Sequence, residues 1–134
     1  MQKIINVACG IVCHQGKVLV TQRGPHKSNP LLWEFPGGKM EAGESVEKCL
    51  HRELLEELGI RVKIISSLSV TEYDYGDFSI RLHPLVGDFA GGNIRLSDHL
   101  NYVWATPESL TGFDWTPADI PVVTRFLKQI ETHR

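Results

Sequence analysis

One segment, the predicted helix between Ser45 and Gly59, constrains the fold of this 134-residue chain more than any other. Ser45 is a favoured N-cap residue and Gly59 stands where a glycine typically ends a helix, so roughly fourteen residues should be helical. At about 100° per residue, Val46, Cys49 and Leu50 share one face of that helix. One and two turns later the same face carries only carboxylates, those of Glu53, Glu56 and Glu57. An apolar stripe therefore becomes acidic within one helix.

The acidic half of this face has two interpretations. It is either an exposed, solvated run of glutamates, which is the common case, or a partly buried cluster that a bound cation compensates. Oxygen ligands at this density suit Mg²⁺, with Mn²⁺ as the alternative, whereas zinc would favour paired cysteines or an HExxH helix, which the sequence lacks. Such hard cations usually complete their ligand shell with phosphate oxygens, so the second interpretation predicts a phosphate-bearing substrate.

The remaining pattern predicts an α/β fold. Short β-branched runs flank a hairpin signal at Gln15 and Gly16. We expect strands at residues 7–14, 17–22, 33–35, 61–75, 78–89 and 101–105, a loop at 24–31 and a turn at 36–38. A last helix should open with Thr116 as its cap and Pro117 in its first position, and its buried face should consist of Ile120, Val123, Leu127 and Ile130. Helices between and after the strands indicate a sheet covered on both sides.

Composition limits the size, the partners and the compartment of the protein. A length of 134 residues predicts a single domain over residues 1–134. The net charge near −2 argues against a surface built to coat polymeric nucleic acid. No apolar run approaches the roughly 18 residues that a membrane-spanning helix needs. Cys9, Cys13 and Cys49 show neither a disulfide framework nor metal-ligand spacing, so a reducing cytoplasm is expected.

The residues before and along the acidic helix form an extended motif. Gly38 is followed by five residues, then Glu44, then seven residues, then the run Arg-Glu-Leu-Leu-Glu-Glu-Leu-Gly-Ile at 52–60. This spacing matches, without departure, the signature GX5EX7REUXEEXGU of the Nudix hydrolases, in which U is a bulky aliphatic residue, and the chain therefore resembles that family. Gly10, the run 17–23, the approach 33–39 and the C-terminal helix also resemble its MutT-like branch. The resemblance implies a Nudix α/β/α sandwich with a mixed sheet and a loop-helix-loop catalytic motif that holds Mg²⁺.

The resemblance also implies roles for the motif residues. Arg52 would orient the carboxylates, since a guanidinium can fix a carboxylate through paired hydrogen bonds; its simpler role is a salt bridge to Glu56 along the helix. Glu44, just before the helix, either acts on the metal through a water or complements the positive end of the helix dipole. The metal ligands would be the carbonyl oxygen of Gly37 and the carboxylates of Glu53, Glu56 and Glu57.

Four further residues are candidates for contact with the substrate or the attacking water. Gly38 offers backbone that approaches phosphate closely or simply makes a turn, and Lys39 either reaches a phosphate or screens the acids. Arg23 resembles an arginine that contacts nucleotide phosphates in MutT-like proteins, or it is a surface charge. Asp98 lies where this branch commonly has an acidic residue that serves as ligand or general base, or it caps a loop. No role is expected for His99 or the other histidines.

The segment 117–121 bears on the base of the nucleotide. It resembles the corresponding run of CTP pyrophosphohydrolases, and Asp119 stands where MutT enzymes that prefer 8-oxo-dGTP have Asn. An ionised carboxylate only accepts hydrogen bonds, so it suits the exocyclic amine of cytosine and repels O6 of guanine unless it is protonated. Alternatively, Asp119 only completes a helix cap with Thr116. The aromatic side chains that can stack on a base, or belong to the core, are Trp33, Phe35, Phe78 and Trp115.

Together with these residues, the MutT-like resemblance implies a Mg²⁺-dependent nucleoside triphosphate pyrophosphohydrolase that clears damaged or surplus nucleotides. Its products, a nucleoside monophosphate and pyrophosphate, are expected from the resemblance alone. CTP or modified pyrimidine nucleotides are the preferred substrates, and 8-oxo-dGTP hydrolysis is the alternative. From another class, the alternative is a non-catalytic Nudix-fold module that binds nucleotides, although such modules usually lack part of the glutamate cluster. The expected partner is a small nucleotide, without polymeric nucleic acid or membrane, and the chain acts as a monomer or a homodimer.

Overall fold

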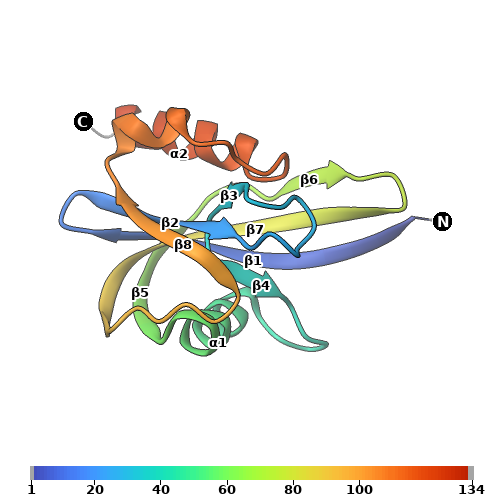
Figure 1. Ribbon diagram of the computed structural model, residues 1–134, viewed down its shortest axis with the longest axis horizontal. Coiled ribbons are helices and arrows are strands. Elements are labelled where there is room, and N and C mark those ends of the chain that lie inside the picture. The colour runs from blue at the N-terminus through green and yellow to red at the C-terminus, as the bar shows by residue number, and fades with distance from the viewer. Residues whose placement is uncertain (1, 133–134) are drawn as a thin grey trace.

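The β-branched and aromatic runs form a mixed sheet of eight strands in the computed structural model, which describes residues 2–132 (Figure 1). The strands are β1 (Lys3–His14), β2 (Lys17–Arg23), β3 (Trp33–Glu34), β4 (Gly37–Lys39), β5 (Ile60–Ser67), β6 (Thr71–Asp74), β7 (Phe78–Gly92) and β8 (His99–Ala105). The helices are α1 (Val46–Leu58) and α2 (Ile120–Thr132), and η1 (Pro107–Gly112) is a 3₁₀-helix. The predicted α/β class is confirmed. Residues 1, 133 and 134 lie outside the described part, so a single domain over residues 1–134 stays a prediction.

Strand β1 organises the sheet. It pairs antiparallel with β2 through the expected hairpin, in which Gln15 and Gly16 adopt φ values of 51° and 76°. It also pairs in parallel with β7, from Lys3 opposite Phe78 to Cys13 opposite Asp88. The remaining strands extend this centre, because β4 pairs with β1, β5 and β6 pair with β7, and β3 and β8 pair with β2.

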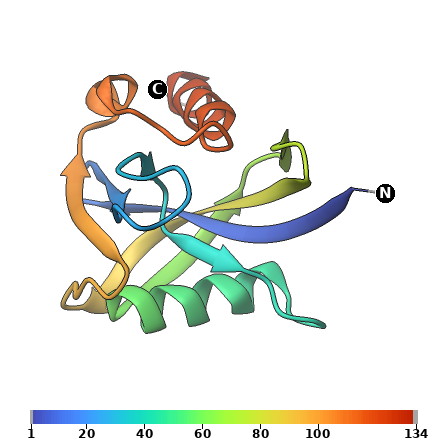
Figure 2. The ribbon, with the colours of Figure 1, turned by 45° about the vertical axis from the view of Figure 1, so that its right-hand side comes forward.

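Helices α1 and α2 lie on opposite faces of the sheet, as Figure 2 shows. A hydrophobic layer lies between the sheet and each helix. Cys9 and Ile11 of β1 belong to the layer under α2, whereas Ala8 and Val12 belong to the layer under α1. Successive side chains of a strand point to opposite faces, so β1 contributes to both layers. This arrangement confirms the expected sandwich. Among residues 2–132, no helix is long and apolar enough to cross a membrane.

Helix α1 begins and ends where its sequence predicts. The Ser45 hydroxyl accepts a 3.2 Å hydrogen bond from the N–H of Lys48. At the other end Gly59 adopts φ 71°, a left-handed conformation that strains other residues, and donates to the carbonyl of Leu55 at 3.0 Å. Burial of one helix face against the sheet sets the direction of the glutamates beside it; the buried residues are Cys49, Leu50, Leu54 and Leu58.

Two predicted boundaries are wrong in the middle of the chain. The expected strand over 61–75 is two strands, β5 and β6, with a break at residues 68–70. Both strands pair with β7, and the break between them lies beside Pro84 of β7. The Pro84 carbonyl accepts a hydrogen bond from the N–H of Leu68 at 3.0 Å, but a proline has no N–H to donate in return. Residues 37 and 38 of the expected turn at 36–38 belong instead to β4, which pairs antiparallel with β1 opposite Val7, Ala8 and Cys9.

The last helix begins later than predicted. Residues 117–119 form a turn in which the N–H of Asp119 donates to the Thr116 carbonyl at 3.0 Å. The first helical hydrogen bond runs from the N–H of Val123 to the Asp119 carbonyl at 3.0 Å, so Asp119 rather than Thr116 is the cap residue. Ile120 is 52% exposed and does not belong to the buried face. That face is formed by Val122, Val123 and Phe126, and the predicted residues Leu127 and Ile130 pack against it partly buried.

Candidate active site

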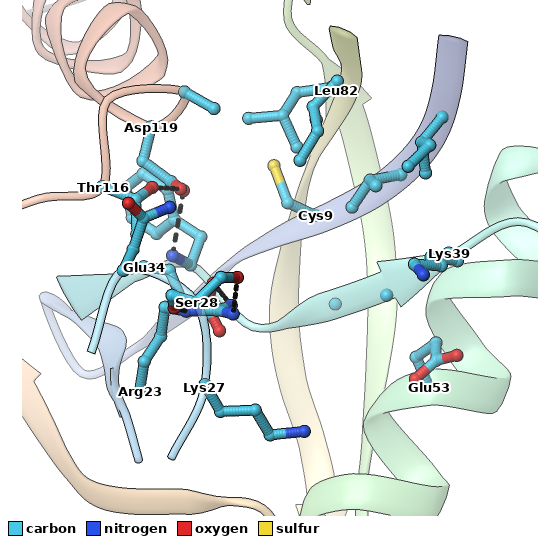
Figure 3. Close-up of a pocket in the computed structure, with 18 of the residues that line it drawn as sticks. Cys9, Arg23, Lys27, Ser28, Glu34, Lys39, Glu53, Leu82, Thr116 and Asp119 are labelled. Carbon is cyan, nitrogen blue, oxygen red and sulfur yellow. Dashed lines mark hydrogen bonds and ion pairs between the residues drawn. The ribbon is translucent and has the colours of Figure 1, made fainter. Parts of the chain in front are cut away.

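A cavity of about 470 Å³ lies between the sheet and the loops that follow β2 and precede β8. Its floor consists of side chains of β1 and β7, and its two ends differ in chemistry. Glu53 and Glu57 of α1 line one end, while Thr116 and Asp119 line the other. Figure 3 shows Asp119 and Thr116 on one side of the cavity and Glu53, near Lys39, on the other. The cavity thus connects the predicted metal end with the predicted base end.

Strand β4 comes close to its neighbours because it begins with two glycines. A Cβ on Gly37 would lie 1.9 Å from the carbonyl oxygen of Ala8. A Cβ on Gly38 would lie 2.3 Å from the carboxyl carbon of Glu53. Side chains are excluded at both positions, so the bare backbone of β4 lies directly against the Glu53 carboxylate. Phosphate binding by this backbone stays a prediction.

Four of the six hydrogen bonds that the Arg52 side chain donates orient the start of the acidic cluster. Its Nε and Nη2 donate to the two carboxylate oxygens of Glu44 at 2.8 and 2.9 Å, and its Nη1 donates to Glu53 at 2.8 Å. Nη2 also donates to the carbonyl of Lys39 at 3.1 Å. Hydrogen bonding from Arg52 lowers the pKa of Glu44 to about 2. Glu44 therefore anchors Arg52, a role that neither of its two predicted alternatives includes.

Glu53 and Glu57 form a carboxylate pair at the cavity, whereas Glu56 does not join them. Burial, followed by the neighbouring charge of Glu53, raises the pKa of Glu57. The Glu56 side chain is 61% exposed and lies 3.4 Å from Nη1 of Arg52, so the simple helix salt bridge is present too. Within residues 2–132, no group of three or more histidine, cysteine or acidic side chains is arranged so that it could hold a metal ion. The structure therefore places two of the three predicted carboxylate ligands together.

The chemistry of this pair fits a hard divalent cation. Two adjacent carboxylates with little access to water repel each other when both are charged, and a cation between them removes that repulsion. The donors at this end, Glu53, Glu57 and the backbone carbonyls of β4, are oxygens, which Mg²⁺ and Mn²⁺ prefer. Glu53 and Glu57 would hold the ion, and the Gly37 carbonyl and the Glu56 carboxylate stay predicted as further ligands.

A second charged network lines the wall between the two ends. Glu34 accepts a hydrogen bond from Nη1 of Arg23 at 2.9 Å and lies 3.0 Å from Nε2 of His99. Arg23 also donates to the carbonyl and the hydroxyl of Ser28 at 2.6 and 3.0 Å. Neither Glu34 nor His99 is among the site residues expected from the sequence. The position of a charged residue between Trp33 and Phe35 could have indicated Glu34 as a site residue. No sequence spacing indicates His99.

Asp98 and Lys39 lie at the rim of the cavity. The Asp98 side chain is 58% exposed, and its Oδ2 is 3.8 Å from Nζ of Lys27. The loop before β8 is held to α1, because the hydroxyl of Ser97 donates to the carbonyl of Glu57 at 3.2 Å. Asp98 lines the cavity from this loop, and its approach to the metal end and its role as ligand or base stay predictions.

Asp119 is a buried carboxyl in the lining of the other end. Its Oδ1 accepts from the N–H of Phe35 at 3.1 Å, and its Oδ2 bonds the hydroxyl of Thr116. Burial, followed by the charge of Glu34, raises the pKa of Asp119 to about 7. The predicted partnership with Thr116 exists between side chains, and the bond to Phe35 additionally ties the start of α2 to the segment between β3 and β4.

Aromatic side chains divide between the cavity and the core. Phe35 and Phe78 line the cavity, as does Tyr75, which the sequence analysis did not select. The rings of Tyr75 and Phe78 stack with centroids 5.4 Å apart and an interplanar angle of 19°. Trp33 and Trp115 pack in the hydrophobic layer under α2, and so does Phe35, which is only 3% exposed. The aromatic surface available to a base is therefore mainly that of Tyr75 and Phe78.

The motif implied this architecture. A mixed sheet lies between two helices, and one of these helices carries a carboxylate pair that faces the cavity. The family described as the NUDIX domain matches residues 4–126, which is most of the chain. The chain therefore belongs to the Nudix hydrolase family, which confirms the resemblance. Members of this family are hydrolases that generally depend on a divalent metal.

Known relatives cover nearly the whole chain. It is 36% identical over 126 residues to the CTP pyrophosphohydrolase of Escherichia coli K12, covering 93% of each protein. It is also 36% identical over 122 residues to the putative 8-oxo-dGTP diphosphatase 2 of Mycobacterium tuberculosis H37Rv, covering 84% of this chain and 81% of that one. The solution structure of the E. coli ORF135 protein matches with a TM-score of 0.86 at 34% identity, covering 98% of this chain and 94% of the other. A MutT protein from Methanosarcina mazei Go1 has a TM-score of 0.86 at 21% identity over 96% of both chains, which shows the shared fold.

Proposed function

We propose that this protein is a nucleoside triphosphate pyrophosphohydrolase that uses Mg²⁺, with Mn²⁺ as the alternative, and prefers CTP or modified pyrimidine nucleotides. One observation carries the proposal: a single cavity joins the carboxylates of Glu53 and Glu57 to the buried carboxyl of Asp119. A nucleotide whose base lies at Asp119 directs its phosphates toward the carboxylate pair. The name of the E. coli relative supports the same substrate class.

The reaction is the attack of water on a phosphoanhydride, with a nucleoside monophosphate and pyrophosphate as products. A divalent cation at Glu53 and Glu57 would neutralise phosphate charge and lower the pKa of a bound water. Arg52 keeps the Glu53 carboxylate oriented through its 2.8 Å hydrogen bond. Both oxygens of Glu44 are occupied by Arg52, so Asp98 is the better-placed candidate to accept the proton of the attacking water.

Three cationic side chains line the cavity and would meet the phosphate charge, those of Arg23, Lys27 and Lys39. Arg23 donates three hydrogen bonds to Ser28 and Glu34, which leaves two of its five N–H groups for a phosphate. Lys27 lies 3.8 Å from Asp98, and this long ion pair leaves its ammonium able to turn toward a nucleotide. Lys39 lies near Glu53 at the carboxylate end, whereas Arg23 and Lys27 lie on the side of Ser28 and Glu34 (Figure 3). The phosphates of a bound nucleotide would run past these cations.

Asp119 would read the base. In its ionised form it accepts a hydrogen bond from an exocyclic amine such as N4 of cytosine. Its pKa of about 7 means that the protonated form is also populated at neutral pH, and that form donates to a carbonyl such as O6 of 8-oxoguanine. This second state favours 8-oxo-dGTP as the second candidate substrate, in agreement with the name of the M. tuberculosis relative.

A panel of nucleotides tests the substrate class. Phosphate is measured after adding inorganic pyrophosphatase, with CTP, 5-hydroxy-dCTP, 8-oxo-dGTP and the unmodified nucleotides compared at saturating Mg²⁺. We expect kcat/KM for the cytosine nucleotides to exceed that for 8-oxo-dGTP, and the reverse order would establish the second candidate. Binding of nucleotides without any hydrolysis would show a non-catalytic module and overturn the proposal. Hydrolysis in ¹⁸O-labelled water identifies which phosphorus is attacked.

The role of Asp119 has a separate test. Asp119→Asn replaces one acceptor with a donor at nearly equal size, so the ratio of kcat/KM for CTP over 8-oxo-dGTP should fall by about 10-fold or more. A ratio cancels general losses of stability. An unchanged ratio would leave Asp119 as a structural tie and remove it from base recognition.

The compartment and assembly belong to the same proposal. Cys9, Cys13 and Cys49 are free thiols, which supports a reducing cytoplasm. We expect a monomer or a homodimer, and light scattering after size-exclusion chromatography distinguishes the two. The proposal requires no polymeric nucleic acid.

A further inference from the structure

Glu34 is bound on both carboxylate oxygens by residues of adjacent strands. Its Oε1 accepts from Arg23 of β2 at 2.9 Å, and its Oε2 lies 3.0 Å from Nε2 of His99 of β8. Strand β2 pairs with β3 on one side and with β8 on the other, and Arg23 stands opposite His99 in that pairing. The side chains of Glu34 and His99 are only 20% and 6% exposed. The three residues form one chain of hydrogen bonds in the wall of the cavity.

The hydrogen bonds assign the tautomer of His99. A carboxylate that is paired with a guanidinium only accepts, so Nε2 of His99 carries the hydrogen. The other ring nitrogen, Nδ1, is buried and has no hydrogen-bond partner among residues 2–132. An unpaired buried nitrogen is unfavourable, and an apolar side chain of similar size would avoid it. Packing alone therefore does not account for a histidine at this position, whereas donation to Glu34 does.

We propose that His99 is a positioning residue for nucleotide binding. Its Nε2–H fixes the carboxylate of Glu34, and Glu34 in turn fixes the guanidinium of Arg23 toward the phosphates. The inference rests on the proposed function of the cavity and adds to it a residue that acts through others rather than on the substrate.

Arg23 needs this support because its own surroundings are irregular. The β2–β8 register shifts between Gln22 and Arg23, and the following loop contains two residues with positive φ, Asn29 at 48° and Leu31 at 66°. Without a fixed Glu34, the guanidinium of Arg23 would keep only its hydrogen bonds to Ser28, which lies in that same loop. The position of the guanidinium would then depend on the loop instead of the sheet. Its two free N–H groups would no longer be held toward the phosphates.

Three substitutions at His99 separate the donated hydrogen from the ring. In His99→Gln an amide N–H falls near the position of Nε2, in His99→Asn it falls near Nδ1 and does not reach Glu34, and His99→Leu has no donor. The dissociation constant for a non-hydrolysable α,β-methylene analogue of CTP is measured by calorimetry with Mg²⁺, beside kcat and KM for CTP. We expect Kd and KM to rise by about 10-fold in the Asn and Leu variants, with kcat within about 3-fold and the Gln variant near the wild type.

The matched control is His83→Asn. Nε2 of His83 on β7 also bonds a side-chain oxygen, that of Asn6 at 3.0 Å, but His83 does not line the cavity, so Kd should not change. If the Asn and Leu variants of His99 fail to fold in a thermal melt, Glu34→Gln provides the second measurement, since it removes the charge that holds Arg23 and should raise Kd similarly.

Two results would overturn the inference. Equal Kd values for the Gln and Asn variants, or wild-type binding by Glu34→Gln, would show that donation from Nε2 does not position Arg23. A fall in kcat with unchanged Kd would place His99 in the chemical step. Failure of the proposed function looks different, because the wild-type protein would then neither bind the analogue nor hydrolyse any nucleotide of the panel.

Discussion

Replacing Asp119 with asparagine tests whether burial of its carboxyl destabilises the protein at neutral pH. Burial, with the charge of Glu34 as the second cause, raises its pKa from 3.8 to about 7. Between about pH 4 and pH 7 the folded protein therefore keeps a proton that the unfolded chain has lost, and stability falls as the pH rises through this range. At about 1.36 kcal/mol per pKa unit, the fall approaches roughly 4 kcal/mol above pH 7.

Asp119→Asn keeps the shape of the side chain and removes this dependence. The amide oxygen still accepts from the N–H of Phe35, and the amide nitrogen can donate to the hydroxyl of Thr116. Urea unfolding at several pH values gives the free energy of unfolding of both proteins. Relative to the wild type, the variant should gain roughly 3 to 4 kcal/mol between about pH 4.5 and about pH 8.

Asp98→Asn is the control, because that carboxylate lies at the rim and is 58% exposed. Its stability relative to the wild type should show little change with pH. Glu57, whose pKa is also raised, is present in all three proteins and cancels from the comparison. The reasoning would be refuted if the free energies of unfolding of Asp119→Asn and the wild type differed by the same amount at both ends of the pH range.

The carboxylate end leads to three further predictions. Glu57→Gln should lower kcat by more than about 100-fold, while melts in EDTA show it at least as stable as the wild type, because the repulsion from Glu53 is relieved. A Glu57→Gln variant that is less stable than the wild type in EDTA would contradict repulsion between Glu53 and Glu57. Gly38→Ala should weaken Mn²⁺ binding, measured by electron paramagnetic resonance, by about 10-fold, since its Cβ would lie 2.3 Å from the Glu53 carboxyl carbon. In the control Gly112→Ala, the added Cβ would have no neighbouring atom within 4 Å, so Mn²⁺ binding should not change. Glu44→Gln removes the charge that pairs with Nε and Nη2 of Arg52 and leaves the guanidinium held mainly by Glu53, so the Mg²⁺ concentration for half-maximal activity should rise several-fold. An unchanged Mg²⁺ requirement would remove Glu44 from the positioning of the cluster.

Local sequence determined the elements that depend on neighbours in the chain. Ser45 and Gly59 bound helix α1 through bonds to residues within a few positions, and Gln15 with Gly16 closes a hairpin by its own backbone preference. The spacing from Gly38 to Ile60 identified the family for the same reason, because a loop and one helix carry the whole motif. The direction of Glu53 and Glu57 followed from the apolar face that α1 must bury.

Tertiary structure decided everything that depends on pairing between distant segments. The break between β5 and β6 arises from Pro84 on β7, and the late start of α2 follows from a carboxyl, Asp119, that bonds Phe35 from 84 residues away. His99 and Glu34 are 65 residues apart, so no periodicity can reveal their hydrogen bond or the burial that accompanies it. Pairings of this kind depend on the register of β2 with β3 and β8. That register is settled by the packing of the whole sheet, because the local preferences of a strand specify which faces are apolar but not which neighbour it meets.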